Sequence, residues 1–414
     1  MRACAAETPV DLPAGTPWPR RPGPVLDWLV AEGRHLPDPG ALVKGLGRRL
    51  VEAGVPLYRV SFHVRILHPQ LMGESVRWRR SAPDEVEESH APRGIELTDT
   101  FLRSPVRVLF EGAGGLRQRL DVAERAYDFP VFEELRAEGA TDYVAMPVTF
   151  TDGRVHGTTW TSDRPGGFDT EDLIRIADLL PVLGILLEVH ATRRIAATLL
   201  DTYVGRQAGE RVLSGQITRG SGETIRAAIW YCDLAGFTAL SERAERDAVI
   251  ATLNGYFERM AAPVERHGGE ILKFIGDAML AIFPLGRPGV GGRAVAAAGE
   301  AHGLMAGLNA ERRRRGEEPL GYGIALHAGD VMYGNIGAPD RLDFTVIGPA
   351  VNLAVRLEQL TRSLGAAVLL SDDFVRLCDC GDAFPSLGRH RLRGIGRPVE
   401  VFVLPEALPA GSAA

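Results

Sequence analysis

Two apolar runs of the sequence break into glycine-bearing turns, and an aspartate lies at each break. Asp233 follows residues 229–232, and Asp277 follows residues 271–275 and Gly276. This pattern places each carboxylate at the end of a strand, beside backbone N–H groups that a sheet does not use. Two such carboxylates a short distance apart could hold two divalent cations against a triphosphate, an arrangement suited to in-line displacement at phosphorus.

The composition is that of an ordinary globular protein. The chain has 414 residues, of which 45% are hydrophobic and 24% charged, enough for two or three domains. Its formal charge of -6 argues against a general nucleic-acid binder, and the basic run at residues 312–315 is interpreted as a solvated helix end.

The cysteines and the hydropathy indicate the compartment. The 4 cysteines match neither a zinc spacing nor a disulfide framework, which favours a reducing environment. No apolar run reaches the roughly 18 residues of a membrane helix, and the first residues lack the apolar core of a signal peptide. We therefore expect a soluble, cytoplasmic protein without membrane insertion.

The first half of the chain has a mixed pattern of helices and strands. Residues 1–24 are rich in proline and are predicted to be a disordered leader. An Asp152-Gly153 pair predicts a hairpin, and Asp169 or Thr170 is predicted to cap a helix that starts within residues 168–172. The periodicity predicts helices at residues 25–32 and 41–53, and strands at residues 57–67, 75–79, 106–110, 143–150 and 156–161.

These elements are typical of a small sensor module. Their order resembles the GAF and PAS architecture, which predicts a regulatory domain at residues 25–190. Helical spacing continues through residues 185–213, so residues 191–221 are expected to be a helical linker. A linker of this kind either transmits rotation or dimer packing to a second domain, or simply connects the two.

The second half reads as an α/β unit at residues 222–405, followed by a flexible tail at residues 406–414. The predicted order is a strand at 224–232, a helix starting at Thr238 or Ser241, a helix at 247–267, a hairpin at 270–283, a helix at 293–315, a strand at 322–328, a hairpin at 331–337 and a segment at 343–360. This order and its motifs resemble the class III nucleotidyl cyclase catalytic domain. The resemblance implies an α/β (α+β) fold, a ferredoxin-like βαββαβ catalytic domain preceded by the GAF/PAS-like sensor domain.

The resemblance also implies a metal site and a phosphate site. Asp233 and Asp277 match the two aspartates that bind two Mg²⁺ or Mn²⁺ ions, and the carbonyl of Leu234 matches a backbone metal ligand. The turn whose amides cradle the β- and γ-phosphates at a helix N-terminus corresponds to Leu234, Ala235, Gly236, Phe237 and Thr238.

Further positions match residues that contact the nucleotide. Lys273 and Thr345 match the two base-reading positions, and Asn352 matches the residue that orients the ribose. Arg356 matches the arginine that neutralises the α-phosphate in the transition state. Arg393 matches a lysine or arginine that binds phosphate in the family. Independently of the family, Asn352 and Arg356 are four residues apart and share one helix face, so they can address one ligand together. The planar fork of arginine suits a phosphoryl group that gains charge.

The spacing of Lys273 and Asp277 predicts a dimer. Both lie on one hairpin, too close together to reach the base and the metals of one extended ATP. In the family the active site lies between two chains, so a chain carrying both halves is expected to form a homodimer with two composite sites and to be inactive as a monomer.

The base-reading positions favour adenine. A lysine and threonine pair is typical of the IIIb-like subgroup often described as bicarbonate-responsive, whereas guanylate-specific members usually have glutamate where Lys273 stands. The sequence therefore predicts an adenylate cyclase, a lyase that converts ATP to 3',5'-cyclic AMP and pyrophosphate, with bicarbonate or another small molecule as a possible regulator. Pro349 stands where this subgroup commonly has aspartate and is expected to adjust a loop.

Three alternatives are weighed against this prediction. One is guanylate cyclase activity, which depends on Lys273 and Thr345. Another is a catalytically weak module that binds nucleotide or dimerises. The third is a diguanylate cyclase, suggested by the glycine pair in residues 266–271, but Ile271 and Leu272 replace the second acid and the aromatic of that signature.

Overall fold

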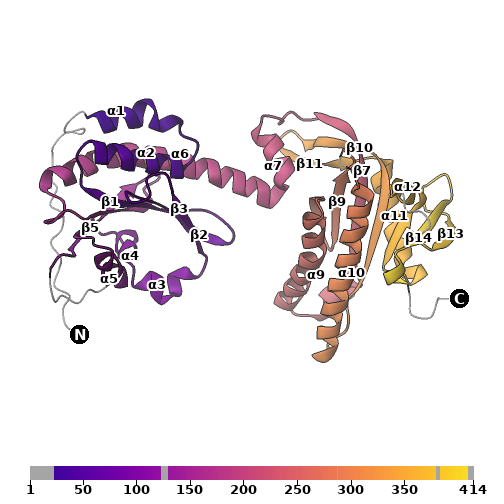
Figure 1. Ribbon diagram of the computed structural model, residues 1–414. Coiled ribbons are helices and arrows are strands. Elements are labelled where there is room, and N and C mark those ends of the chain that lie inside the picture. Colours follow the sequence, from indigo (N-terminus) through magenta and orange to yellow (C-terminus); the bar gives the residue numbers. More distant parts are fainter. Residues whose placement is uncertain (1–22, 123–128, 287, 379–382, 409–414) are drawn as a thin grey trace. The chain divides into compact units, whose positions relative to one another are not determined.

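The computed structural model describes residues 23–122, 129–286, 288–378 and 383–408 (Figure 1). The chain divides into two compact units, Met1–Thr198 and Leu199–Ala414, and each is described by itself. Residues 1–22 of the predicted leader and residues 409–414 of the predicted tail lie outside the described part. None of the helices in the described part combines the length and the hydropathy that a membrane span requires.

The first unit is built on a six-stranded sheet whose neighbouring strands are all antiparallel, in the order β3-β2-β1-β6-β5-β4. The strands are β1 (Leu57–Arg65), β2 (Leu71–Arg79), β3 (Glu87–Pro92), β4 (Leu116–Arg119), β5 (Asp142–Thr149) and β6 (Val155–Ser162).

Helices cover both faces of this sheet (Figure 1). One face is apolar and packs against α1 (Pro24–Ala31), α2 (Pro39–Glu52) and α6 (Thr170–Val204). Short helices lie over the other face, namely α3 (Asp99–Leu102), α4 (Pro105–Phe110) and α5 (Pro130–Ala137). Two short 3-10 helices occupy Gly33–His35 and Ile95–Leu97.

The predicted strand at residues 106–110 is wrong, because these residues form helix α4. Ser104 caps it by accepting a hydrogen bond from the amide of Val106 at 3.3 Å, and Pro105 occupies the first turn. Val106 and Leu109, three residues apart, both face Gly157 of β6. A short apolar run suits a strand and a buried helix equally well, and packing on the sheet decides between them.

The start of α6 follows the predicted cap. The amide of Asp172 donates to Oδ1 of Asp169 at 2.8 Å, and the amide of Asp169 donates to Oδ2 of Asp172 at 3.0 Å. This reciprocal pair satisfies amides that have no partner inside the helix. The predicted helix at 185–213 is interrupted at Gly205, whose φ of 94° is accessible to glycine, and α7 (Arg206–Leu213) follows.

The second unit contains an eight-stranded sheet in the order β13-β14-β12-β10-β7-β9-β8, with β11 paired to β10. Its strands are β7 (Gly222–Ala235), β8 (Glu270–Ile275), β9 (Ala278–Pro284), β10 (Gly321–Ala338), β11 (Arg341–Ile347), β12 (Val368–Ser371), β13 (Ser386–His390) and β14 (Val399–Val403). Its helices are α7, α8 (Phe237–Arg243), α9 (Arg246–Arg266), α10 (Val290–Arg314), α11 (Pro349–Leu364) and α12 (Asp372–Leu377), with a 3-10 turn at Pro405–Ala407. The order β7-α-β8-β9-α10-β10 confirms the predicted βαββαβ arrangement.

Alternation along β7 divides this core into two layers. Trp230 and Cys232 point to the layer that contains α9 and α10, which lie side by side across the sheet (Figure 1). Ala227 and Ile229 point to the opposite layer, where α7 and α11 contribute buried alanines. Asp233 has the same parity as Ala227 and Ile229, so β7 presents it on the face of α11.

The predicted separation of a strand at 322–328 from a hairpin at 331–337 is wrong. β10 is one strand of 18 residues that runs through Gly329 and Asp330. Its antiparallel ladder with β7 is unbroken from Gly321 to Gly334. A glycine weakens a strand without ending it when a neighbouring strand supplies a continuous ladder.

Candidate active site

Asp233 and Asp277 approach each other at one end of the sheet. Asp233 forms the last pair of the β7–β9 ladder, opposite Ala278, which is the residue after Asp277. Asp277 occupies the turn between β8 and β9, after Gly276, whose φ is 64°. Burial, followed by the neighbouring Asp277 carboxylate, raises the pKa of Asp233 to about 6.

This pair fits a divalent cation. Two carboxylates that repel each other gain when a cation lies between them, and carboxylate oxygens are the ligands that Mg²⁺ prefers. No group of three or more histidine, cysteine, aspartate or glutamate side chains suited to a metal occurs in the described part of the chain. A cation bound here would have these two aspartates as its side-chain ligands, with backbone or non-protein oxygens beside them.

Arg362 is a neighbour of Asp233 that the sequence analysis missed. Its Nη2 donates to Oδ2 of Asp233 at 3.3 Å, and the arginine side chain is 57% exposed. Arg362 lies on α11, six residues after Arg356. In the sequence, the available signal for Arg362 was Glu358 four residues before it, because residues at this spacing share a helix face.

Glu358 lies behind the aspartate pair. Its side chain is only 2% exposed, and Oε1 has no hydrogen-bond partner among the described residues. Burial, then the charge of Asp233, raises the pKa of Glu358 to about 7. Gly323, opposite Asp233 on β10, makes room for it, because a Cβ there would collide with Oε1 of Glu358 and Oγ1 of Thr361.

Lys273 is held by a second residue that the sequence analysis missed. Its Nζ donates to Oδ2 of Asp343 on β11 at 2.8 Å, and this hydrogen bond lowers the pKa of Asp343. Asp343 and Thr345 are two residues apart on one strand and therefore point to the same face. Thr345 is 5% exposed, and its Oγ1 has no partner in the described part of the chain. In the sequence, the signal for Asp343 was its position two residues before Thr345.

Asn352 and Arg356 lie on α11, as the four-residue spacing predicts. Asn352 is exposed, and Nη1 of the half-buried Arg356 donates to Oε1 of Gln359 at 3.0 Å. Pro349 is the first residue of this helix, a position where proline is favoured because no N–H partner is needed. The proline thus starts the helix that carries both residues.

The predicted phosphate-binding residues lie at the end of β7, at the start of α8 and in the loop before β14, and Leu234 among them is buried. Gly236, with a φ of 78°, caps α8, and the first-turn amides of a helix have no partner inside it. The turn consists of Leu234, Ala235, Gly236, Phe237 and Thr238. Arg393 is exposed in the loop before β14 and forms no ion pair with another described residue.

Asn352 is displaced along α11 from Arg362, the residue of this helix that contacts Asp233. Arg362 contacts Asp233, whereas Asn352 lies ten residues earlier on the same helix. At 1.5 Å per residue this is a rise of about 15 Å. The ribose-binding position is therefore displaced along α11 from the aspartates of its own chain.

Comparison with known proteins finds a match to a family within this unit. Residues 221–405 match the model of the adenylate and guanylate cyclase catalytic domain. The adenylate cyclase of Anabaena cylindrica is 35% identical over 193 residues, which are 46% of this chain and 37% of that protein. The chain thus spans less than two fifths of that curated relative.

Two solved structures are also similar. The guanylyl cyclase Cya2 is 31% identical, with 44% of this chain and 92% of that chain covered and a TM-score of 0.39. The adenylyl cyclase CyaB from P. aeruginosa is 30% identical, with 44% of this chain and 95% of that chain covered and a TM-score of 0.39.

Proposed function

We propose that residues 221–405, which match the model of the adenylate and guanylate cyclase catalytic domain, form a class III cyclase domain and that the protein is an adenylate cyclase. The reaction forms a bond between the ribose 3'-oxygen and the α-phosphorus of ATP and breaks the bond between the α-phosphorus and the bridging oxygen to the β-phosphate. The products are 3',5'-cyclic AMP and pyrophosphate, and the 3'-hydroxyl proton is released to water. The observation that carries the proposal is the fixed Lys273 beside Thr345, together with the paired Asp233 and Asp277.

Base selection is assigned to Lys273 and Thr345. The ammonium has three donors, and Asp343 accepts from it, so donors remain for a ring nitrogen of adenine. The unpartnered hydroxyl of Thr345 can accept a hydrogen from the adenine amino group. The name of the Anabaena relative, adenylate cyclase, agrees with this choice.

Asp233, the carbonyl of Leu234 and Asp277 would hold two Mg²⁺ or Mn²⁺ ions. When bound, these ions supply Lewis-acid activation of the 3'-hydroxyl and neutralise the triphosphate. The carboxylates of Asp233 and Asp277 keep the ligand oxygens together at one end of the sheet. The turn from Leu234 to Thr238 then offers its amides to the β- and γ-phosphates.

The remaining side chains orient and stabilise the reacting groups. Asn352 hydrogen-bonds the ribose, and Arg356, four residues later, donates to the α-phosphate oxygens as charge builds there. Arg393 supplies a further cation for the terminal phosphates. Removing one such donor to a transition state typically costs about 10²- to 10³-fold in rate.

We assign the active form to a homodimer with two composite sites. The displacement of Asn352 by about 15 Å along α11 from the aspartates of its own chain supports this assignment. Each site would take Asp233 and Asp277 from one chain, and Lys273, Asn352 and Arg356 from its partner. Residues 25–190 would act on this dimer as a regulatory domain through the helical residues 191–221.

Mixing two inactive variants tests the proposal. Asp277→Ala and Lys273→Ala are each expected to lose at least 100-fold in ATP turnover. Because they damage different halves, mixed chains should form heterodimers with one intact site and recover up to about a quarter of wild-type activity after random exchange. A mixture of Asp277→Ala with Asp233→Ala, which damages the same half, is the matched control and should stay inactive.

The same assays separate this proposal from its alternatives. Equal or faster turnover of GTP would replace adenylate by guanylate cyclase activity. Nucleotide binding without turnover, in wild-type protein that is dimeric and supplied with Mn²⁺, would identify a binding module. Absence of rescue, once subunit exchange is demonstrated with labelled chains, would refute the composite site.

A further inference from the structure

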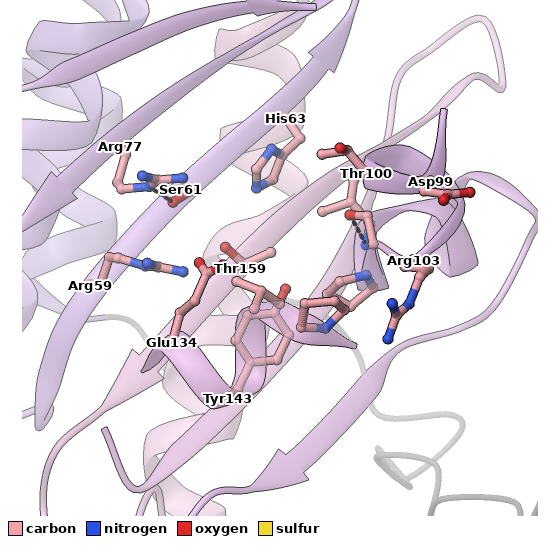
Figure 2. A pocket seen from close by; sticks show the side chains of 15 residues that line it. Arg59, Ser61, His63, Arg77, Asp99, Thr100, Arg103, Glu134, Tyr143 and Thr159 are labelled. Carbon is pink, nitrogen blue, oxygen red and sulfur yellow. Dashed lines mark hydrogen bonds between the residues drawn. The ribbon is translucent and has the colours of Figure 1, made fainter. Parts of the chain in front are cut away.

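A cavity lies in the first unit between the sheet and the short helices over it (Figure 2). Its volume is about 460 Å³. The sheet contributes six polar side chains to its wall: Arg59, Ser61, His63, Arg77, Tyr143 and Thr159. Pro105 and Val106 from α4, and Pro130 and Val131 from α5, line the helical side.

The polar wall is buried. Arg59 is 6% exposed, Ser61 1%, Tyr143 2% and Thr159 3%. The polar wall comes from the four adjacent strands β2, β1, β6 and β5, and Ser61 of β1 lies opposite Thr159 on one side and Arg77 on the other. Burying polar groups is unfavourable unless they have hydrogen-bond partners, so a buried sheet face of this composition favours a bound polar ligand.

Arg59 is the clearest unsatisfied group. Its guanidinium forms no ion pair with another described residue, and Nε has no hydrogen-bond partner there. Burial, followed by the nearby charge of Arg77, lowers the pKa of Arg59 to about 10. The Glu138 carboxylate offsets part of the charge of Arg59 without forming an ion pair with it, so a bound anion would relieve the remaining cost of this buried cation.

Arg77 supplies a second cation from the adjacent strand. Its Nε donates to Oγ of Ser61 at 3.4 Å, and Nη1 bonds Oε2 of Glu87 at 3.0 Å. Figure 2 shows Arg59 and Arg77 on neighbouring strands with Ser61 between them. Arg103 also lines the cavity, where it is exposed and has no ion pair within the described residues.

The other titratable groups leave this charge in place. His63 bonds Ser75 through Nδ1 at 2.7 Å, and burial lowers the pKa of His63 to about 3, so the imidazole is neutral. Asp99 and Glu134 line the cavity from the helices, but both are exposed, and neither forms an ion pair with the cavity arginines.

We propose that this cavity binds a small organic anion, with its carboxylate or phosphate group between Arg59 and Arg77 and its apolar body against the prolines and valines of α4 and α5. The volume lies in the range of about 300–1,000 Å³ that is usual for small-molecule pockets. It is much larger than bicarbonate needs. Arginine forks match the planar oxygens of such acids through paired hydrogen bonds. This inference does not depend on the proposed function, because it concerns the first unit alone.

Calorimetric titration of the full-length chain, free of divalent metal, tests the inference with three probes of one shape. Benzoate and phenyl phosphate carry the two acid groups on the same ring, and benzamide is the neutral counterpart of benzoate. We expect one site per chain for at least one anion, and at least 10-fold weaker binding of benzamide. The better of the two anions identifies a carboxylate or a phosphate site.

Variants connect binding to the cavity. Arg59→Gln is expected to weaken the favoured anion by about 10-fold or more, the usual loss for a hydrogen bond to a charged group. Arg175→Gln is the matched control and should bind within about 2-fold of wild type, because Arg175 is an exposed residue of α6, which covers the opposite face of the sheet. If circular dichroism shows that Arg59→Gln does not fold, Arg77→Gln and Arg59→Lys take its place. Failure of both anions to bind at millimolar concentration, or binding that survives the loss of either cavity arginine, would overturn the inference.

Discussion

Lys273 of β8 and Asp343 of β11 form a hydrogen-bonded ion pair, with 2.8 Å between Nζ and Oδ2. The side chains are 29% and 59% exposed, so the pair adds little to stability. Its main effect is to fix the direction of the ammonium beside the strand that carries Thr345. We therefore regard Asp343 as a positioning residue for base recognition.

Asp343→Asn is expected to reduce the preference for ATP over GTP. The amide keeps the size of the side chain but removes the charge that orients Lys273, so kcat/KM for ATP should fall about 10-fold, the loss of a charge-assisted hydrogen bond. Steady-state turnover of both nucleotides measures the ratio. Asp340→Asn, an exposed substitution in the same hairpin, should change neither value. An unchanged ratio in Asp343→Asn would limit the ion pair to a structural role.

Gly323→Ala is expected to displace α11. The added Cβ would collide with Glu358 and Thr361, both buried, and overpacking of this kind costs about 1–3 kcal/mol. Because α11 also carries Asn352 and Arg356, ATP turnover should fall with the melting temperature. Gly303→Ala on the exposed face of α10 has open space around its Cβ and should preserve both. Wild-type melting and turnover in Gly323→Ala would show that the helix is not held as the structure indicates.

Arg362→Gln is expected to lower the Mn²⁺ concentration needed for half-maximal turnover. Arg362 donates a hydrogen bond to Oδ2 of Asp233 and so competes with a cation for that oxygen. An exposed ion pair contributes up to about 1 kcal/mol, so its loss should change the required Mn²⁺ concentration by at most about 5-fold. Titration of activity with Mn²⁺ at saturating ATP measures it. Arg313→Gln, an exposed arginine at the end of α10, is the control. A higher Mn²⁺ requirement in Arg362→Gln would mean that the arginine assists binding.

His327 is expected to destabilise the second unit on mild acidification, in opposition to Asp233 and Glu358, whose raised pKa values favour the folded state as the pH falls. Burial is the main reason why the pKa of His327 is lowered to about 4 in the folded state, whereas the pKa of a histidine in the unfolded chain is about 6.5. The unfolded state therefore takes up the proton first, so this stability is fully present above pH 6.5 and declines toward pH 4. The slope is at most about 1.4 kcal/mol per pH unit.

His327→Gln should remove this contribution, so the second unit should lose less stability, or gain more, between pH 7 and pH 5 than the wild-type protein. Hydrogen exchange of β10 amides between pH 7 and pH 5 reports the unfolding of this unit by itself. His90→Gln, which replaces an exposed histidine, should leave this change in stability as in wild type. An unchanged difference in stability between pH 7 and pH 5 in His327→Gln would assign the acid sensitivity to other groups.

Sequence patterns predicted the order of elements from β7 to β10, where most strands and helices are long and periodic, but not α12, β12, β13 and β14, which have only 4 to 6 residues. The same patterns failed for residues 106–110, where a run of five residues gives too little periodicity to separate helix from strand. They also divided β10 at Gly329, because a glycine weakens a strand locally and its ladder partner β7 lies about a hundred residues earlier. Asp343 and Arg362 were missed for the same reason, since each gains its meaning from a distant partner.

By itself the sequence determined which residues lie at strand ends and which share a helix face, because these follow from periods of 2 and 3.6 residues. Asp233, Asp277, Asn352 and Arg356 belong to this class. Only the tertiary structure decided which alternating face is covered. Along β1, Arg59, Ser61 and His63 alternate with apolar residues as on a solvent-facing strand, yet α3, α4 and α5 bury that face. Burial of this kind depends on helices distant in sequence, and it converts an ordinary polar face into a cavity whose buried Arg59 forms no ion pair with another described residue.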